Sequence, residues 1–125
     1  MNILLDTHII LWWLANDSHL SNASREIIAN TKNSIYVSAA SAWEISIKKS
    51  LGKLDAPDDF EITLLSNGFL PLPITISHAQ LAGFLPKHHE DPFDRMLIAQ
   101  SKIEKFTLLT HDKHLALYEA KIKLN

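Results

Sequence analysis

The stretch Asn2-Ile3-Leu4-Leu5-Asp6-Thr7-His8-Ile9-Ile10 decides the fold class. Its apolar run over residues 2–5 stops abruptly at Asp6, as a buried strand does. Thr7 then opens a helical pattern of apolar residues that continues to Leu14. The stretch therefore predicts a buried strand that passes directly into a helix, with a carboxylate at the junction.

The rest of the chain repeats this alternation of strands and helices. We expect further strands at 35–37, 69–76, 106–109 and 122–124, the second of them an edge strand because Pro71 and Pro73 cannot donate ladder hydrogen bonds. We expect helices at 24–31, 39–51, 58–67, 77–84, 92–103 and 113–118, with N-caps at Ser21, Asp58, Ser77 and Asp91. Such alternation favours a parallel sheet covered by helices on both faces.

Length and composition are those of one ordinary folded domain spanning residues 1–125. The 125 residues are 46% hydrophobic and 21% charged, and a chain of this size buries roughly two-thirds of the surface that its unfolded form exposes. The net charge of −2 excludes broad, charge-driven coating of nucleic acid. It leaves open binding at one local groove.

The chain has no cysteine, which excludes disulfide scaffolds, zinc–thiolate sites and thiol nucleophiles. Its first residues carry no basic region, and Asp6 interrupts the apolar run too early for a signal peptide. The longest apolar stretch, 9–15, is too short to span a bilayer. We expect a soluble, cytoplasmic protein without a membrane partner.

Four acidic residues fall at comparable points of the predicted fold. Asp6 ends the first strand, and Glu44 lies in the helix that follows the second. Asp94 falls in the first turn of the helix that begins at Pro92, and Asp112 follows the strand at 106–109. Parallel sheets bind ligands beyond the carboxyl ends of their strands. We therefore expect the four carboxylates to gather at one edge of the sheet.

Carboxylates brought that close repel one another, and a hard divalent cation such as Mg²⁺ or Mn²⁺ removes the conflict. Such an ion polarises a phosphoryl oxygen and lowers the pKa of water, so this pattern indicates metal-dependent phosphodiester hydrolysis. Each acid also has a plain structural explanation. Asp6 and Asp112 could cap helices, Glu44 could face solvent, and Asp94 could complement a helix dipole.

With these acids in view, the chain resembles the PIN-domain ribonucleases, and specifically the VapC-like toxins of type II toxin–antitoxin systems. The resemblance covers nearly the whole chain. Four segments carry it: Leu4-Leu5-Asp6-Thr7-His8, Ser38-Ala39-Ala40-Ser41-Ala42-Trp43-Glu44-Ile45, His89-Glu90-Asp91-Pro92-Phe93-Asp94-Arg95-Met96-Leu97-Ile98-Ala99-Gln100 and Leu108-Leu109-Thr110-His111-Asp112.

The resemblance implies a three-layer α/β/α sandwich with a central parallel sheet of four to five strands. It also implies endoribonuclease activity dependent on Mg²⁺ or Mn²⁺, inhibition by a small cognate antitoxin, and a homodimer. The family's catalytic, metal-binding acids correspond to Asp6, Glu44, Asp94 and Asp112. Asp91 competes for the third place. We choose Asp94, because helix geometry aims its side chain at the helix N-terminus while Asp91 has a capping role.

Supporting roles follow as hypotheses. Thr110 could hold Asp112 or a water at the metal, and Ser38 could do the same below Glu44. Arg95 and Lys113 are the nearest cations for substrate phosphates. A plain surface or capping role is the alternative for each.

Other interpretations receive less support. His88 and His89 form no spaced zinc signature, and their role stays open. Phosphoryl transfer through an aspartyl phosphate at Asp6 is disfavoured, because His8 stands where such enzymes place a second aspartate. A non-catalytic module that binds RNA or protein on the same scaffold remains the alternative function.

The three tryptophans are abundant for a chain of this size. We expect Trp12, Trp13 and Trp43 to pack in the core, with an interface as the alternative. Trp43, Ile47 and Leu51 share one stripe of the helix at 39–51.

Overall fold

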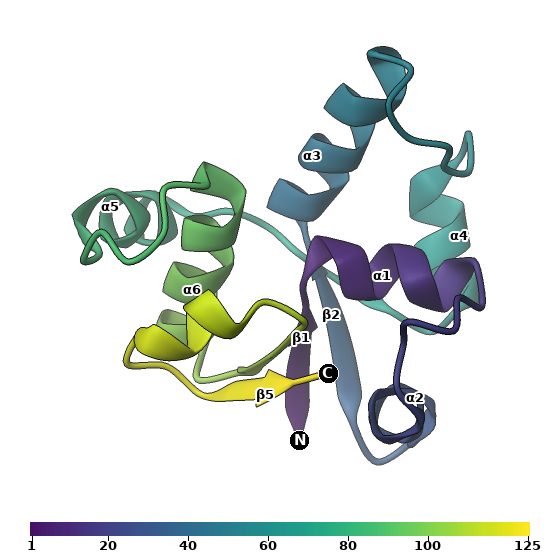
Figure 1. Cartoon of the computed structure of the whole chain (residues 1–125), viewed down its shortest axis with the longest axis horizontal. Helices are drawn as coiled ribbons and strands as arrows, with labels where there is room; N and C mark the ends of the chain where they lie inside the picture. The colour runs from purple at the N-terminus through teal and green to yellow at the C-terminus, as the bar shows by residue number, and fades with distance from the viewer.

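The computed structural model describes residues 1–125, and its centre is one sheet of five strands. The strand order is β3-β2-β1-β4-β5, and every neighbouring pair is parallel (Figure 1). The strands are β1 (Asn2–Leu5), β2 (Ser34–Ser38), β3 (Leu70–Leu72), β4 (Thr107–Thr110) and β5 (Ile122–Leu124). The expected parallel sheet is confirmed.

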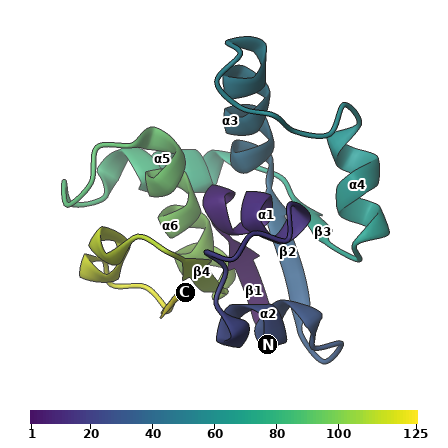
Figure 2. The ribbon, with the colours of Figure 1, turned by 45° about the vertical axis from the view of Figure 1, so that its right-hand side comes forward.

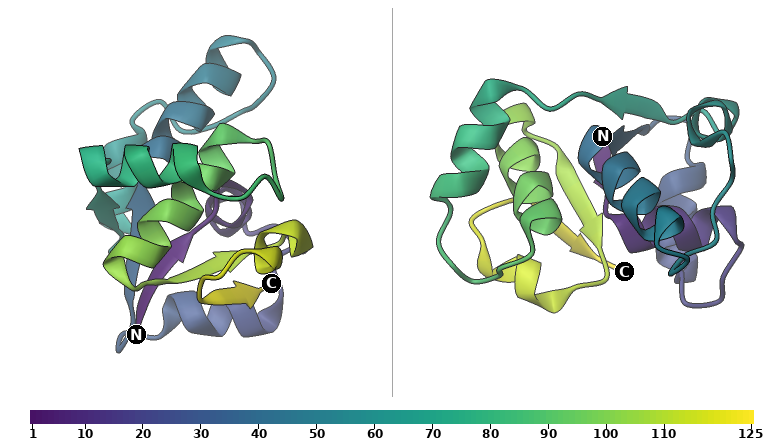
Figure 3. Two further views of the ribbon diagram at one scale, coloured as in Figure 1. Left: turned by 90° about the vertical axis from the view of Figure 1, so that its left-hand side faces the viewer. Right: turned by 90° about the horizontal axis from the view of Figure 1, so that it is seen from above.

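The helices lie on both faces of this sheet (Figures 2 and 3). They are α1 (Thr7–Leu14), α2 (Asn22–Ala29), α3 (Ala39–Ser50), α4 (Phe60–Ser66), α5 (Ile76–Phe84), α6 (Pro92–Glu104) and a 3₁₀ turn η1 (Lys113–Leu117). The view from above shows α5 and α6 on one side and α1 and α4 on the other. No helix combines the length and the apolar character needed to cross a membrane.

Two apolar cores lie between the sheet and its helices, and β1 contributes to both. Ile3 and Leu5 pack with α1, α2 and α4, whereas Leu4 packs with α5 and α6. Successive side chains of a strand point to opposite faces, so a continuous apolar run is what a doubly covered strand requires. The three-layer α/β/α sandwich is therefore confirmed.

Two of the expected helix caps are wrong. Asp59, not Asp58, caps α4 by accepting from the backbone N–H of Ile62 at 3.1 Å, while Asp58 pairs with Lys49. Thr75, not Ser77, caps α5, in a reciprocal capping box with His78. Both regions contain several neighbouring residues that are able to cap, so residue type alone does not choose among them.

The edge strand is shorter than expected, and one tryptophan is exposed. β3 covers only Leu70–Leu72 of the expected 69–76, in keeping with prolines that cannot donate ladder hydrogen bonds. It lies at the edge of the sheet, as predicted. Trp12 and Trp13 are partly buried against the core. Trp43 is 63% exposed, so its expected core packing is wrong.

β1 lies at the centre of the sheet, between β2 and β4, and the direction in which successive strands are added reverses there. Asp6 follows β1 directly, and Thr110 ends β4 beside it. α3 rises from the same end of β2 (Figure 1). Crevices at such reversal points are where open parallel sheets bind ligands. The topology therefore assembles a polar region at the carboxyl ends of β1, β2 and β4.

Candidate active site

Asp6 is 2% exposed at the junction of β1 and α1, and its two carboxylate oxygens have different partners. Oδ1 accepts from the backbone N–H of Ile9 at 2.9 Å and so caps α1. Oδ2 accepts from the hydroxyl of Thr110 and from the backbone N–H of His111. Capping thus uses one oxygen and leaves the other facing the end of β4.

Glu44 reaches the same region from α3 and is 6% exposed, so it does not face solvent. Its Oε1 accepts from the hydroxyl of Thr7 at 2.6 Å. Its Oε2 pairs with the ammonium of Lys48, one helical turn on, at 3.0 Å. Thr7, the residue after Asp6, therefore ties the second acid to the first.

Asp94 and Asp112 come together around one imidazole. Nε2 of His89 lies 3.0 Å from Oδ2 of Asp94 and 3.1 Å from Oδ2 of Asp112. The backbone N–H of Asp91 points at the other ring nitrogen, Nδ1, at 3.3 Å. Nδ1 is then an acceptor, so Nε2 carries the hydrogen and donates to Asp112, with the carboxylate of Asp94 beside it. Asp91 itself caps α6 through Phe93 and Asp94.

The electrostatics of Asp94 connect these acids. Burial, followed by the negative charges of Asp91 and Asp6, raises the pKa of Asp94 to about 7, and Glu44 adds to the same effect. Burial also acts to raise the pKa of Asp112, but hydrogen bonds from the backbone and ring of His114 and from His89 hold it below its usual range. Repulsion among carboxylates from separate elements is what a shared pocket produces.

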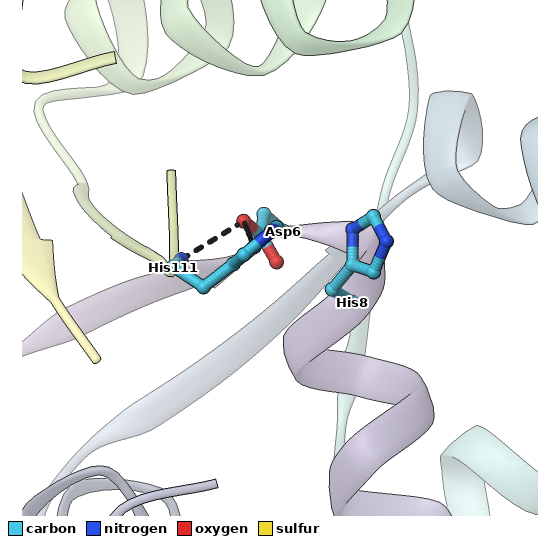
Figure 4. A group of neighbouring side chains, drawn as sticks. All are labelled: Asp6, His8 and His111. Atoms are coloured by element: carbon cyan, nitrogen blue, oxygen red, sulfur yellow. Dashed lines mark hydrogen bonds and ion pairs between the residues drawn. The ribbon is translucent and has the colours of Figure 1, made fainter. Parts of the chain in front are cut away.

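Two histidines, His8 and His111, lie beside Asp6 (Figure 4). Nδ1 of His111 lies 3.3 Å from Oδ2 of Asp6, and this hydrogen bond raises the pKa of His111. The ring of His8, at the start of α1, lies 4.4 Å from that of His111. Burial, and then the neighbouring charge of His111, lowers the pKa of His8.

The structure redirects several expected supporting residues. The hydroxyl of Thr110 donates to Asp6 and accepts from the backbone N–H of Asp112 at 3.1 Å, so it joins two of the acids. Ser38 caps α3 through the N–H of Ala40 instead of contacting Glu44. The hydroxyl oxygen of Ser38 thus serves the new helix as its cap, and a role toward Glu44 or a water at the metal stays a prediction.

The expected phosphate-binding role of Arg95 is also not what the structure shows. Its guanidinium donates to the backbone carbonyls of Ala82 and Leu85, both at 2.9 Å, and of Pro86 at 3.0 Å. A forked cation with several donors can satisfy a turning loop in this way. Lys113 remains exposed.

Sequence reasoning missed four polar contributors: Thr7, Lys48, His89 and His111. The spacing of Glu44 and Lys48 is a readable signal, since residues four apart share one face of a helix. Thr7 and His111 directly follow and precede residues already singled out. His89 could not be placed, because its position depends on the path of the loop before α6.

The donor set fits a hard divalent cation. One group of possible ligand atoms comes from Asp6, His8 and His111, and a second from His89, Asp94 and Asp112; within each group the atoms lie within 4.8 Å of one another. The carboxylate oxygens are the ligands that Mg²⁺ and Mn²⁺ prefer. Burial and the neighbouring carboxylates raise the pKa of Asp94, and a bound cation would instead favour its charged form.

The fold and the site together define a three-layer α/β protein with a metal-compatible acidic centre where its strand order reverses. The chain belongs to the PIN-domain family, whose model matches residues 3–121. The resemblance seen in the sequence is therefore confirmed.

Similar proteins include two ribonucleases of Mycobacterium tuberculosis. The chain is 29% identical to Ribonuclease VapC22 over 116 residues, which cover 90% of this chain and 88% of the relative. It is 38% identical to Ribonuclease VapC16 over 69 residues, so that match spans 45% of the length of VapC16 and 49% of this chain.

Solved structures share the fold at low identity. The chain superposes on a structure of VapBC2 from Rickettsia felis bound to a DNA fragment from their promoter, with a TM-score of 0.73, 14% identity and coverage of 100% of this chain and 99% of the other. A structure of FitAcB from Neisseria gonorrhoeae matches with a TM-score of 0.65, 18% identity and coverage of 98% and 96%.

Proposed function

We propose that this single-domain chain is an endoribonuclease that hydrolyses RNA phosphodiester bonds with the help of Mg²⁺ or Mn²⁺, and that it is the toxin of a toxin–antitoxin pair. The observation that carries the proposal is the convergence of acids from separate elements: Asp94 and Asp112 meet at Nε2 of His89, and Thr110 joins Asp112 to Asp6. The relatives named ribonucleases support the substrate class.

Asp6, Glu44, Asp94 and Asp112 would hold the ion. When bound, the ion supplies Lewis-acid polarisation of a phosphoryl oxygen and a lowered pKa for water. The chain's own contribution is orientation. Thr7 fixes Glu44, and Thr110 fixes Asp6, by hydrogen bonds to their carboxylates. Water is the nucleophile, so no protein nucleophile is needed.

Cleavage of RNA by purified protein tests this function. Wild type is compared with Asp6→Asn and Asp94→Asn in Mg²⁺, in Mn²⁺ and in EDTA. Each variant exchanges one carboxylate oxygen for a nitrogen that cannot bind the ion. We expect a loss greater than the roughly 10–100-fold typical of residues that only support a metal ligand.

Asp58→Asn is the matched control, because Asp58 is exposed and pairs with Lys49 away from the site. It should cleave like wild type. Full activity in Asp6→Asn and Asp94→Asn would contradict the metal site, and RNA binding without cleavage by wild type would indicate a binding module.

A small cognate antitoxin, a homodimer and a cytoplasmic location complete the proposal. Large apolar side chains are exposed on α5 and α3: Phe84 is 87% exposed, Ile76 78% and Trp43 63%. Exposed apolar surface of this kind is typical of protein interfaces. The absence of cysteine agrees with a reducing compartment. Sedimentation of the purified chain should give twice the monomer mass. Co-expression with the cognate antitoxin should yield a complex of the two proteins.

A further inference from the structure

A groove of about 710 Å³ begins at the candidate site and runs along α1. One wall is α1, with His8, Leu11 and Trp12, and the other is the end of α3 with the segment that follows it, including Lys48 and Lys53. Thr7, which is bonded to Glu44, lines the inner end. Whatever occupies this groove therefore extends directly from the acidic centre.

The α1 wall is built from flat rings. Trp12 contacts the rings of His8 and His111, with centroids 5.8 Å and 5.1 Å away. The exposed ring of His19 stacks on Trp12 at 5.4 Å with an interplanar angle of 21°. This stack shows that the face of Trp12 accepts a planar ring.

The opposite wall is cationic. Lys53 is exposed, and Lys48 is half-exposed beside Glu44. Two acids, Asp17 and Asp55, also line the groove. The carboxylate of Asp17 is already engaged by the backbone and ring of His19, at 2.8 Å and 2.6 Å. Lys53 forms no ion pair, whereas the ammonium of Lys48 is paired with Glu44 at the inner end of the groove.

We infer that this groove binds the single-stranded RNA next to the bond that is cut, with a base against the rings of His8 and Trp12 and the backbone phosphates at Lys48 and Lys53. Stacking on aromatic rings and phosphate contacts with amines are the two modes by which proteins hold single-stranded RNA. A base edge is not read, so the groove adds affinity with little sequence preference. The inference rests on the proposed function, because it treats RNA as the substrate.

Binding of a short fluorescent single-stranded RNA of roughly ten nucleotides, followed by anisotropy in EDTA, tests the inference. EDTA prevents cleavage, so the readout does not depend on activity. We expect Trp12→Ala to weaken binding roughly tenfold, as loss of one stacked base does, and Trp12→Phe to retain most of the affinity. Lys53→Gln should weaken binding and reduce the salt slope by about one.

Lys32→Gln is the control, because Lys32 is an exposed lysine in the turn before β2 and does not line the groove. It should bind like wild type. Lys53 is exposed and makes no side-chain hydrogen bond, so its variant tests the inference even if Trp12→Ala folds poorly. Equal affinity of wild type, Trp12→Ala and Lys53→Gln would overturn the inference. If these variants bind RNA as wild type does but no longer bind the antitoxin, the groove is instead the binding site of a protein partner.

Kinetics separate this inference from the function on which it rests. With Mg²⁺ or Mn²⁺, Trp12→Ala should raise KM for RNA and leave kcat largely unchanged, because the ring does not touch the acids. If wild type binds RNA through Trp12 but cleaves none, the proposed function fails and the groove stands. If wild type cleaves RNA and neither Trp12→Ala nor Lys53→Gln changes KM, the inference about the groove is wrong and the proposed function stands.

Discussion

Asp6 divides its two oxygens between structure and chemistry. Oδ1 caps α1 through Ile9, which fixes the orientation of the carboxylate and aims Oδ2 at Thr110. The hydroxyl of Thr110 both donates to Asp6 and accepts from the N–H of Asp112. One hydroxyl group therefore sets the spacing of two acids that lie at opposite ends of the chain.

Thr110→Val tests that coupling. Valine keeps the shape of threonine but removes the hydroxyl, so Asp6 loses a donor and the N–H of Asp112 loses its acceptor. We expect Mn²⁺ to bind roughly 10–100-fold more weakly, as measured by calorimetry. Thr110→Ser should bind like wild type. Unchanged affinity in the valine variant would show that Thr110 does not position the acids.

The raised pKa of Asp94 predicts how metal binding depends on pH. In the metal-free protein this group has a pKa of about 7, and only its charged form is a ligand. Mn²⁺ affinity should therefore fall roughly tenfold for each pH unit below about 7 and level off above it. Asp94→Asn should remove that dependence. A flat profile in wild type between pH 5 and about 7 would contradict the prediction.

The same shift has a consequence for folding. Because the pKa of Asp94 is higher in the folded than in the unfolded chain, its contribution to stability is fully present below the ordinary aspartate pKa of 3.8 and is lost as pH rises through about 7. Without metal, Asp94→Asn should raise Tm relative to wild type at alkaline pH and not at acidic pH. If the Tm difference between Asp94→Asn and wild type were the same at alkaline and acidic pH, the charge of Asp94 would not be its cause.

Arg95 on α6 organises the loop that delivers His89. Its guanidinium donates to carbonyls of Ala82, Leu85 and Pro86, and a longer contact reaches the carbonyl of His89 at 3.3 Å. The loop thereby gains its hydrogen bonds from a side chain. We infer that α6 positions both Asp94 and, through Arg95, the imidazole that meets it.

Arg95→Ala should therefore destabilise the fold by about 2–3 kcal/mol, because buried carbonyls lose a charged donor. Arg95→Lys should recover little, since an ammonium cannot reproduce the forked contacts. Urea denaturation followed by circular dichroism measures both. Lys87→Ala, an exposed change in the same loop, is the control. If Arg95→Ala has the same urea midpoint as wild type, the hydrogen bonds of Arg95 to the loop carbonyls contribute nothing to stability.

At the level of elements, apolar runs and caps were enough to predict β1, β2, β4, α1 and α6. The stripe of Trp43, Ile47 and Leu51 misled, because α3 projects beyond the end of β2 (Figure 1), and Trp43 and Leu51 are largely exposed. The buried face of α3 instead carries Glu44 and Ser41. The spacing of apolar residues shows that they share one face of a helix, but it does not show whether that face packs against another element.

The site was predictable only in part, for a related reason. Asp6, Asp94 and Asp112 follow from their places after a strand or at a helix start, and Glu44 from its place in the helix after β2, because parallel strands end at one edge of the sheet. The partners of Arg95 and His89 depend on the path of the loop before α6, which no periodicity encodes. Asp94 meets His89 and Asp112, while Asp91 caps α6.

For the whole molecule, the strand order β3-β2-β1-β4-β5 is what creates the site. Placing β1 between β2 and β4 brings Asp6 beside Thr110, 104 positions away in the chain, and lets α3 and α6 reach the same point. The assembly concentrates negative charge in a buried place. We propose that this concentrated negative charge binds a divalent ion.

Anomalous scattering from crystals grown with Mn²⁺ tests that claim most directly. We predict a peak bonded to carboxylate oxygens of Asp6 and Asp94, with Glu44 and Asp112 within its shell of ligands and waters, and no such peak in Asp6→Asn crystals. A well-diffracting wild-type crystal with Mn²⁺ bound only elsewhere, or with no ion among these four carboxylates at saturating Mn²⁺, would contradict the account.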